Sequence, residues 1–311
     1  MRELRICSLL PSATEIVFAL GLGQHLVAVT HECDFPPEVA RLPVITRSTL
    51  DHGTRRSRDV HHHIAGALHR GSSIYALDQD LLERLDPSLI LTQELCDVCA
   101  VSYDVVEKAV HHLAGERTLL SLEPTSLSGI LETLTQVGEA AGAGERAMAL
   151  VAELQGRIDG IAAATTAARR RPRVFAMEWL DPPFAAGHWV PEMIRLAGGH
   201  GDLTQQGSPS SQIAWDRVVD YDPEIIVLMP CGFTLARTIE EFADAELPQA
   251  WSRLTAVQSG HVYAVNGSAY FNRPGPRIVE GLQILAEIIH PEVIMRATPP
   301  EAWRRVEARG A

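Results

Sequence analysis

Short apolar segments alternate with amphipathic segments along the chain, and this alternation constrains the fold more than any other feature of the sequence. Such alternation is typical of a mainly parallel β-sheet covered by helices. In the first half, the predicted strands are Leu4–Leu10, Leu26–Val29, Leu89–Leu91 and Thr118–Leu120, and the predicted helices are Ser12–Leu20, Val60–His69, Gln79–Leu85, Val101–Leu113 and Ser126–Ala141.

A second alternating series follows one long helical segment. Residues 142–170 carry apolar side chains at helical spacing and few of the Gly, Ser and Pro clusters that mark coil, which predicts a rigid connecting helix. Beyond it we expect strands at Arg173–Glu178, Ile225–Met229 and Val262–Val265, and helices at Val190–Leu196, Ala214–Val219, Thr238–Ala243 and Arg277–Ile289. The sequence therefore predicts an α/β fold with two Rossmann-like lobes, residues 1–141 and 171–311, each a mainly parallel sheet with flanking helices, joined by one connecting helix.

The first helix carries a start signal. Pro11 sets the turn, Ser12 is the predicted N-cap, and Glu15 three residues later completes a capping box. We therefore expect a helix that begins at Ser12 and is capped by its own side chains.

Charge and hydropathy narrow the function classes. The formal net charge of −12 argues against a nucleic-acid partner, because phosphate binding relies on clustered Lys and Arg. No apolar run approaches the roughly 18 residues needed to span a membrane, so we expect a monomer that is not membrane-embedded. The segment Leu4–Leu10 follows Met1 as a strand without a secretory leader, which predicts a cytoplasmic location; a periplasmic or cell-surface location follows if a leader was removed.

Several short motifs resemble one known family. They share their order and spacing with that family across nearly the whole chain, and they are Ser8–Glu15, Asp34–Pro37, Leu82–Ile90, Pro182–Phe184 with Gly187, and Phe271–Arg277. In these motifs the chain resembles the class III substrate-binding proteins of ABC importers, in particular the cobalamin-binding type. The resemblance implies two lobes joined by a single helix and a small-molecule ligand held in the cleft between them. It also implies one acidic residue on each lobe that docks on an importer permease, and these positions match Glu83 and Asp216.

The first predicted binding segment follows the strand Leu26–Val29. It reads His31-Glu32-Cys33-Asp34, and Phe35 comes next. In Rossmann-type sheets the loops after the strands line the binding crevice. We therefore predict that His31, Glu32 and Phe35 contact a ligand, as the resemblance also implies.

The second predicted binding segments lie in the C-terminal lobe and combine aromatic side chains with polar ones. Aromatic faces with a few polar groups suit a flat, amphipathic ligand, although ordinary packing is the alternative for Trp179, Trp189 and Phe271. His188 is either a metal ligand or a hydrogen-bonded histidine, and Arg273 could pair with an acidic group. The resemblance implies an aromatic contact through Tyr270 or Phe271. With these two, the predicted ligand contacts are Glu178, Trp179, His188, Trp189, Phe233, Tyr270, Phe271 and Arg273.

The cysteines support an alternative function. Cys33, Cys96, Cys99 and Cys231 follow predicted strands, and a Cys-x-x-Cys pair can ligate zinc or an iron–sulfur cluster or act as a redox couple. The alternative to a metal or iron–sulfur site is four reduced, half-buried thiols.

Three function classes follow from these patterns. The leading hypothesis is a binding protein that holds a corrinoid such as cobalamin and requires no cofactor. The second is a cytosolic metal or iron–sulfur protein that uses the four cysteines. The third is an enzyme with a nucleophilic cysteine, which is least favoured because the sequence fixes no His–Cys pairing. The sequence also contains no GxSxG, HExxH or GxxxxGKS motif, which weakens the enzyme hypothesis, and we predict no enzymatic activity.

Overall fold

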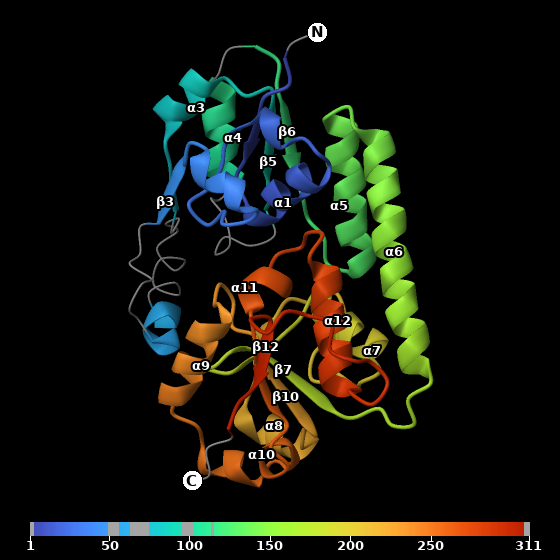
Figure 1. Ribbon diagram of the computed structural model, residues 1–311. Helices are drawn as coiled ribbons and strands as arrows, with labels where there is room; N and C mark the ends of the chain where they lie inside the picture. The colour runs from blue at the N-terminus through green and yellow to red at the C-terminus, as the bar shows by residue number, and fades with distance from the viewer. Residues whose placement is uncertain (1–2, 49–55, 63–74, 95–102, 113–114, 308–311) are drawn as a thin grey trace. The chain divides into compact units, whose positions relative to one another are not determined.

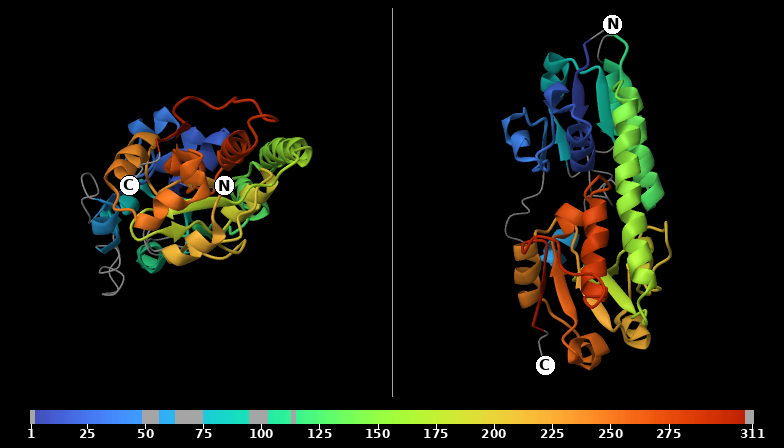
Figure 2. Two further views of the ribbon diagram at one scale, coloured as in Figure 1. Left: turned by 90° about the horizontal axis from the view of Figure 1, so that it is seen from below. Right: turned by 45° about the vertical axis from the view of Figure 1, so that its right-hand side comes forward.

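The fold is described by a computed structural model for residues 3–48, 56–62, 75–94, 103–112 and 115–307. The chain divides into two compact units. The N-terminal unit comprises residues 1–55, 59–124 and 128–153, and the C-terminal unit comprises residues 56–58, 125–127 and 154–311. Figures 1 and 2 show the elements of both.

The N-terminal unit is built on a parallel sheet with the strand order β2-β1-β5-β6. Strands β3 and β4 form a separate antiparallel pair, and α3 follows β4 in the chain. The strands are β1 (Ile6–Ser8), β2 (Leu26–Ala28), β3 (Thr46–Ser48), β4 (Tyr75–Leu77), β5 (Leu89–Thr92) and β6 (Thr118–Ser121), and the helices are α1 (Pro11–Ala19), α3 (Gln79–Leu85), α4 (Tyr103–His112) and α5 (Leu127–Ala140). Every residue of the two central strands, β1 and β5, is buried, which is typical of a parallel sheet with both faces covered.

The C-terminal unit has a six-stranded sheet with the order β12-β11-β10-β7-β8-β9. Its three central strands are parallel, whereas β8, β9 and β12 are antiparallel additions at the edges. The strands are β7 (Val174–Trp179), β8 (Phe184–Ala185), β9 (Ser211–Gln212), β10 (Ile225–Leu228), β11 (Val262–Val265) and β12 (Trp303–Arg305), and the helices are α7 (Val190–Leu196), α8 (Trp215–Tyr221), α9 (Leu235–Asp244), α10 (Thr255–Gln258), α11 (Gly267–Tyr270) and α12 (Ile278–Ile289). The side chains of β7 and β10 form the centre of the core, where Phe175, Met177, Ile226 and Leu228 are buried.

One continuous helix, α6 (Gly144–Thr166), carries the chain from one unit to the other (Figure 2). In the N-terminal unit it packs closely on α5, because a Cβ at Gly138 would lie 2.4 Å from the Cβ of Ala147. In the C-terminal unit its buried residues are Leu154, Ile158 and Ile161. The predicted connecting helix is thus present as a single helix, which ends at Thr166, four residues before the end of the predicted segment 142–170.

The predicted capping box at the first helix is wrong. Helix α1 begins at Pro11, its N-cap is Leu10, and no side chain caps it. Proline has no N–H and a fixed φ that suits the first helical position, so the chain enters the helix before Ser12. Ser12 and Glu15 therefore lie within the helix and are buried.

A corner between a helix and a strand occurs once in each unit with the same construction. In both, the helix ends at an aspartate with positive φ, Asp86 (46°) after α3 and Asp222 (43°) after α8, and a proline follows. An arginine from the neighbouring strand's start caps each corner: Arg5 donates two hydrogen bonds to the carbonyl of Leu85 (3.0 and 2.7 Å), and Arg173 donates two to the carbonyl of Asp222 (2.9 and 2.7 Å). The two units therefore repeat one structural motif, which aligns α3 with α8 residue by residue.

Candidate functional site

The carboxyl ends of β7 and β10 bring together residues that lie about 50 positions apart in the chain. The N–H of Cys231, just beyond β10, donates to the carbonyl of Glu178 on β7 (3.2 Å). The rings of Trp179 and Phe233 meet edge to face with centroids 5.4 Å apart. Phe233 is buried and Trp179 is half-buried. The predicted residues Glu178, Trp179 and Phe233 therefore form one cluster, which we call the strand-end cluster.

A hydrogen-bonded chain fixes the carboxyl group of Glu178. The hydroxyl of Ser210 donates to Glu178 Oε2 (2.6 Å), and the same hydroxyl oxygen accepts from the N–H of Gly187 (2.9 Å). Gly187 lies against the 208–210 backbone, since a Cβ there would be 2.3 Å from the carbonyl oxygen of Ser208. Ser210 was not predicted from the sequence, because no periodicity or motif marks a serine whose partner is 32 residues away.

The carboxyl group of Glu178 gains or loses its proton near neutral pH. Burial raises the pKa of Glu178 from its ordinary value of 4.5 to about 7, against the lowering effect of the hydrogen bond from Ser210. Among the residues that the structure describes, no Lys, Arg or His forms an ion pair with this carboxyl group. A half-buried carboxyl without a cationic partner is unusual, and such groups occur most often at functional sites.

His188 adjoins this chain of hydrogen bonds in a strained conformation. Its φ is +50°, which is uncommon for a residue other than glycine. Its ring stacks on Trp189 with centroids 5.5 Å apart, and its buried Nδ1 has no hydrogen-bond partner among the described residues. Burial also lowers the pKa of His188, so the ring is neutral at pH 7. A neutral imidazole with an unmatched nitrogen can serve a ligand as acceptor or donor.

Trp189 and Phe271 are two buried residues joined by a hydrogen bond. The indole Nε1–H of Trp189 donates to the carbonyl of Phe271 (2.9 Å), and both side chains are buried. The packing alternative stated for these two aromatics therefore fits their burial. The next residue, Asn272, has a buried Oδ1 without a partner among the described residues. Asn272 was not predicted from the sequence, because the prediction for this segment used the aromatic ring of Phe271 and the charge of Arg273.

Tyr270 and Arg273 complete the predicted segment at α11. Tyr270 is half-buried, and the guanidinium of Arg277 lies 5.7 Å from the centre of its ring. Arg273 is half-buried and follows Asn272. The predicted contacts of the C-terminal lobe thus lie at the end of β7 and on the segments that follow β8, β10 and β11.

In the N-terminal unit the predicted residues lie after β2. His31 Nδ1 is 2.7 Å from Thr46 Oγ1, and the His31 ring lies 5.2 Å from that of Tyr75 between centroids. His31 Nε2 is 3.3 Å from the carboxylate of Glu32. Phe35 is 41% exposed, which leaves a large aromatic surface open to a ligand. Tyr75 was missed from the sequence, where it falls in a short strand without a marked pattern.

The cysteines do not all fall in the described part of the chain. Cys96 and Cys99 lie outside the described residues, and Cys33 and Cys231 belong to different units. Cys33 Sγ lies 3.1 Å from the hydroxyl of Thr14 and 3.2 Å from that of Thr30. No group of three or more metal-binding side chains occurs among the described residues, and the four-cysteine site stays a prediction.

The two predicted docking residues are both exposed, on α3 and α8. The repeated corner shows which positions of the two helices are equivalent, because equivalent residues lie the same number of positions before Asp86 and Asp222. By this count Asp216 is equivalent to Asp80, and Glu83 is equivalent to Val219. Asp80 and Asp216 are both exposed acidic residues in the first turn of their helices. Asp80 carries no local sequence signal that relates it to Asp216, and the relation comes from the repeated corner.

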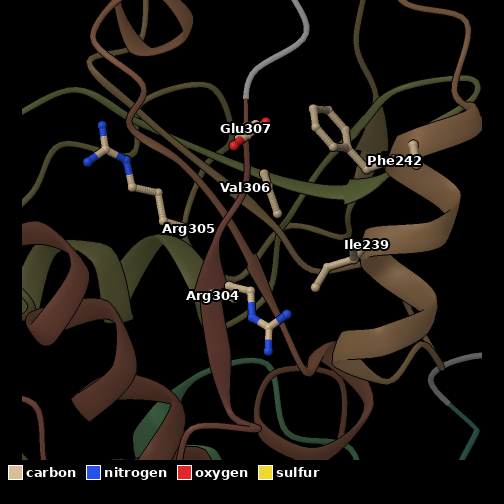
Figure 3. A pocket seen from close by; sticks show the side chains of 7 residues that line it. Ile239, Phe242, Arg304, Arg305, Val306 and Glu307 are labelled. Carbon is tan, nitrogen blue, oxygen red and sulfur yellow. The ribbon is translucent and has the colours of Figure 1, made fainter.

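A pocket of about 230 Å³ lies elsewhere in the C-terminal unit, between α9 and β12 (Figure 3). It is lined by the apolar side chains of Ile239, Phe242 and Val306, with Arg304 and Glu307 at its rim. None of the predicted ligand contacts lines it. Separately, none of the helices in the described part of the chain is both long and apolar enough to cross a membrane.

Comparison with curated proteins places this chain beside importer components. A substrate-binding lipoprotein of an ABC transporter from Bacillus subtilis, YvrC, which is itself uncharacterized, is 26% identical over 93% of this chain and 80% of its own length. The vitamin B12-binding protein of Vibrio cholerae is 25% identical over 90% of this chain and 86% of its own. The cobalamin-binding protein of Halobacterium salinarum is 26% identical over 92% of this chain and 69% of its own.

Solved structures share the fold. The periplasmic vitamin B12-binding protein BtuF of Vibrio cholerae superposes with a TM-score of 0.66 at 21% identity, covering 92% of this chain and 96% of that one. The periplasmic heme-binding protein RhuT from Roseiflexus superposes with a TM-score of 0.70 at 21% identity, covering 94% and 100%. The two-lobed α/β architecture with a long connecting helix is therefore confirmed.

The family match agrees with the fold. Residues 6–269 match the family described as periplasmic binding protein, which is well over half of the chain. This chain belongs to the periplasmic binding protein family.

Proposed function

We propose that this protein binds a corrinoid and presents it to an ABC importer. The observation that carries the proposal is the strand-end cluster, which sets aromatic rings and hydrogen-bonding groups side by side in a chain whose relatives are named for vitamin B12 or cobalamin. A corrinoid is a flat ring with apolar faces and polar groups at its rim, and such a ligand needs both kinds of contact.

Each unit supplies residues for this role. In the C-terminal unit, Trp179 offers a half-buried indole and Glu178 a fixed carboxyl group. In the N-terminal unit, Phe35 is exposed and His31 is oriented by Thr46. The proposal includes no catalytic step and no resident cofactor. An importer role requires the periplasmic or cell-surface location, which is the second of the two locations expected from the sequence.

Trp179→Ala is expected to weaken cyanocobalamin binding by about 10- to 100-fold, because hot-spot aromatic side chains in binding sites contribute about 2 kcal/mol or more. Isothermal titration calorimetry measures the affinity, and the visible absorbance of the corrin ring gives an independent readout. Trp215→Phe, on α8 and outside the cluster, is the control and should bind as the wild type does.

Two results would contradict the proposal. If the folded wild-type protein binds no corrinoid at high micromolar concentration, the proposed ligand is wrong. If Trp179→Ala binds as tightly as the wild type, the ligand is held elsewhere. His31→Ala in parallel reports whether the N-terminal unit contributes to the same affinity.

We also propose that Asp80 and Asp216 are the acidic pair that docks on the permease. The repeated corner places them at equivalent positions on α3 and α8, whereas the equivalent of Glu83 is the apolar Val219. A pair of equivalent acids suits a permease with two related subunits, since symmetric partners present matching surfaces.

Asp80→Ala and Asp216→Ala are each expected to lower the yield of crosslinks to a permease at least tenfold in membranes of the cells that make this protein, because each removes one charge of the pair. Mass spectrometry identifies the crosslinked subunit. Glu83→Ala is the control and should crosslink normally. Loss of crosslinking in Glu83→Ala with normal crosslinking in Asp80→Ala would show that Glu83 is the docking residue.

A further inference from the structure

The strand-end cluster and the turn beside it hold unmatched acceptors on Glu178 and Asn272 and an unmatched donor on Trp179. The carboxyl group of Glu178 is held through Oε2 alone, and Asn272 Oδ1 is buried without a partner among the described residues. His188 Nδ1 is a third unmatched polar atom, on a ring that is neutral at pH 7. The unmatched donor is Trp179 Nε1. Buried polar atoms are nearly always paired, so these atoms point to groups on a ligand.

These four residues are joined by contacts within the C-terminal unit. Glu178 and Trp179 are neighbours on β7, and the Ser210 hydroxyl links Glu178 to the turn that contains His188. The indole of Trp189, next in that turn, donates to the backbone just before Asn272. These contacts link all four residues into one network within the C-terminal unit.

Two arginines lie near aromatic rings of this unit, but neither forms an ion pair with the carboxyl group of Glu178. Glu178 has no ion pair among the described residues. The guanidinium of Arg237 lies over the ring of Phe233 at 4.0 Å, and that of Arg277 lies near Tyr270. At pH 8 the carboxyl group of Glu178 is mostly ionised, since burial raises its pKa only to about 7. A ligand that meets this surface at pH 8 therefore meets a negative charge.

We propose that Glu178 and Asn272 select a ring whose rim carries primary amides and reject the same ring carrying carboxylates. This inference rests on the proposed function and adds the chemical class of the rim. A primary amide supplies two N–H donors and one carbonyl acceptor, which match the acceptors of Glu178 and Asn272 and the donor of Trp179. A carboxylate supplies no donor, leaves the buried acceptors unpaired and places a second negative charge near Glu178.

The proposal separates two kinds of ligand that occur in the names of related structures. Corrinoids carry amides at the rim of the ring, whereas heme carries carboxylates. Sites built to hydrogen-bond a donor group reject an analogue without it strongly, because the buried partners are left unpaired. The surface around Glu178 therefore favours the corrinoid class.

Two ligands with one ring and one metal test this directly. Dicyanocobinamide carries amides at the rim, and dicyanocobyrinic acid is the same ring with carboxylates in their place. The affinities of both are measured by titration at pH 8 and 0.3 M salt, which screens the long-range repulsion from the net charge of the protein. We expect the wild type to prefer the amide ring by at least 100-fold.

Isosteric variants show whether this preference arises at the proposed residues. Glu178→Gln is expected to reduce the preference at least tenfold, and Asn272→Asp is expected to increase it. Glu301→Gln is the matched control, since it makes the same change of charge at an exposed position of the same unit and should leave the preference unchanged. Melting temperatures establish that each variant is folded.

The outcomes are distinguishable from a failure of the proposed function. If dicyanocobinamide binds but Glu178→Gln and Glu301→Gln change the preference equally, or if the wild type binds both rings alike, the selectivity is wrong while corrinoid binding stands. If neither ring binds the wild type, the proposed function is wrong and the selectivity is wrong with it.

Discussion

Gly187→Ala is expected to lower corrinoid affinity by about 100-fold and to destabilise the protein by about 2–4 kcal/mol. The new Cβ would lie 2.3 Å from the carbonyl oxygen of Ser208, 2.5 Å from the nitrogen of Ser210 and 2.6 Å from the carbonyl carbon of Pro209. All three are backbone atoms, so no side chain can rotate away and the loop itself must move. Ser210 would then lose its hydrogen bonds to Glu178 and Gly187, and the carboxyl group would no longer be fixed.

A second glycine supplies the control. Gly156 lies on an exposed turn of α6, and a Cβ there meets no atom within 4 Å. Gly156→Ala should stabilise the protein by about 0.5–1 kcal/mol and leave the affinity unchanged, because alanine is the better helix former. Calorimetry gives both the melting temperature and the affinity. Normal binding by Gly187→Ala would mean that the Gly187–Ser210–Glu178 chain does not shape the site.

Glu287→Ala is expected to cost about 3–5 kcal/mol of folding free energy, the range typical of breaking a buried charged network. The side chain is 2% exposed and accepts hydrogen bonds from Gln283 on α12, from the N–H groups of Ala297 and Thr298, from the Thr298 hydroxyl and from Trp303 Nε1. These bonds fasten the segment after α12 and the strand β12. Without the carboxylate, five donors lose their acceptor at once.

The pH dependence of this effect has a definite sign. Burial tends to raise the pKa of Glu287, but the hydrogen bonds from Thr298, Ala297, Trp303 and Gln283 together lower it below the ordinary value. The stabilisation is therefore fully present above pH 4.5 and is lost as the pH falls through the lowered pKa of the folded state.

Urea unfolding of the wild type and Glu287→Ala between pH 7 and pH 3 measures this stabilisation. The gap between the two free energies of unfolding should be largest at pH 7 and should narrow in acid. Glu287→Gln, which keeps the shape but not the charge, should lose most of the stability at pH 7. A gap that does not change with pH would mean that the carboxylate charge contributes nothing and that packing alone explains the loss.

The central strands and most helices could be predicted because their signals are local. Strands β1, β5, β10 and β11 are short apolar runs, and their neighbours bury them on both faces. The antiparallel strands of the C-terminal unit could not be predicted in the same way. Each of β8 and β9 has two residues, which is too short for any periodicity, and β12 reads Trp-Arg-Arg.

The sequence predicted the residue types of the candidate site but not the hydrogen bonds that connect them. Glu178, Trp179 and Phe233 were predicted because they follow apolar strands, and the carboxyl ends of parallel strands meet at one edge. Ser210 and Asn272 were not, since a serine and an asparagine in loops carry no local signal. The equivalence of Asp80 and Asp216 shows the same limit, because it follows from the corner at Asp86 that repeats at Asp222 and not from any local pattern.

The sequence by itself determined the two alternating halves, the helix between them and the kinds of side chain at the strand ends. These follow from hydrophobic periodicity and from strand and helix length, which each segment carries alone. Only the tertiary structure decided that Ser210 reaches Glu178, that Gly187 must lack a side chain, and that Glu287 collects donors from the segment up to Trp303. The physical reason is that a hydrogen bond acts over about 3 Å, so its partners are set by the path of the folded chain and not by their distance along it.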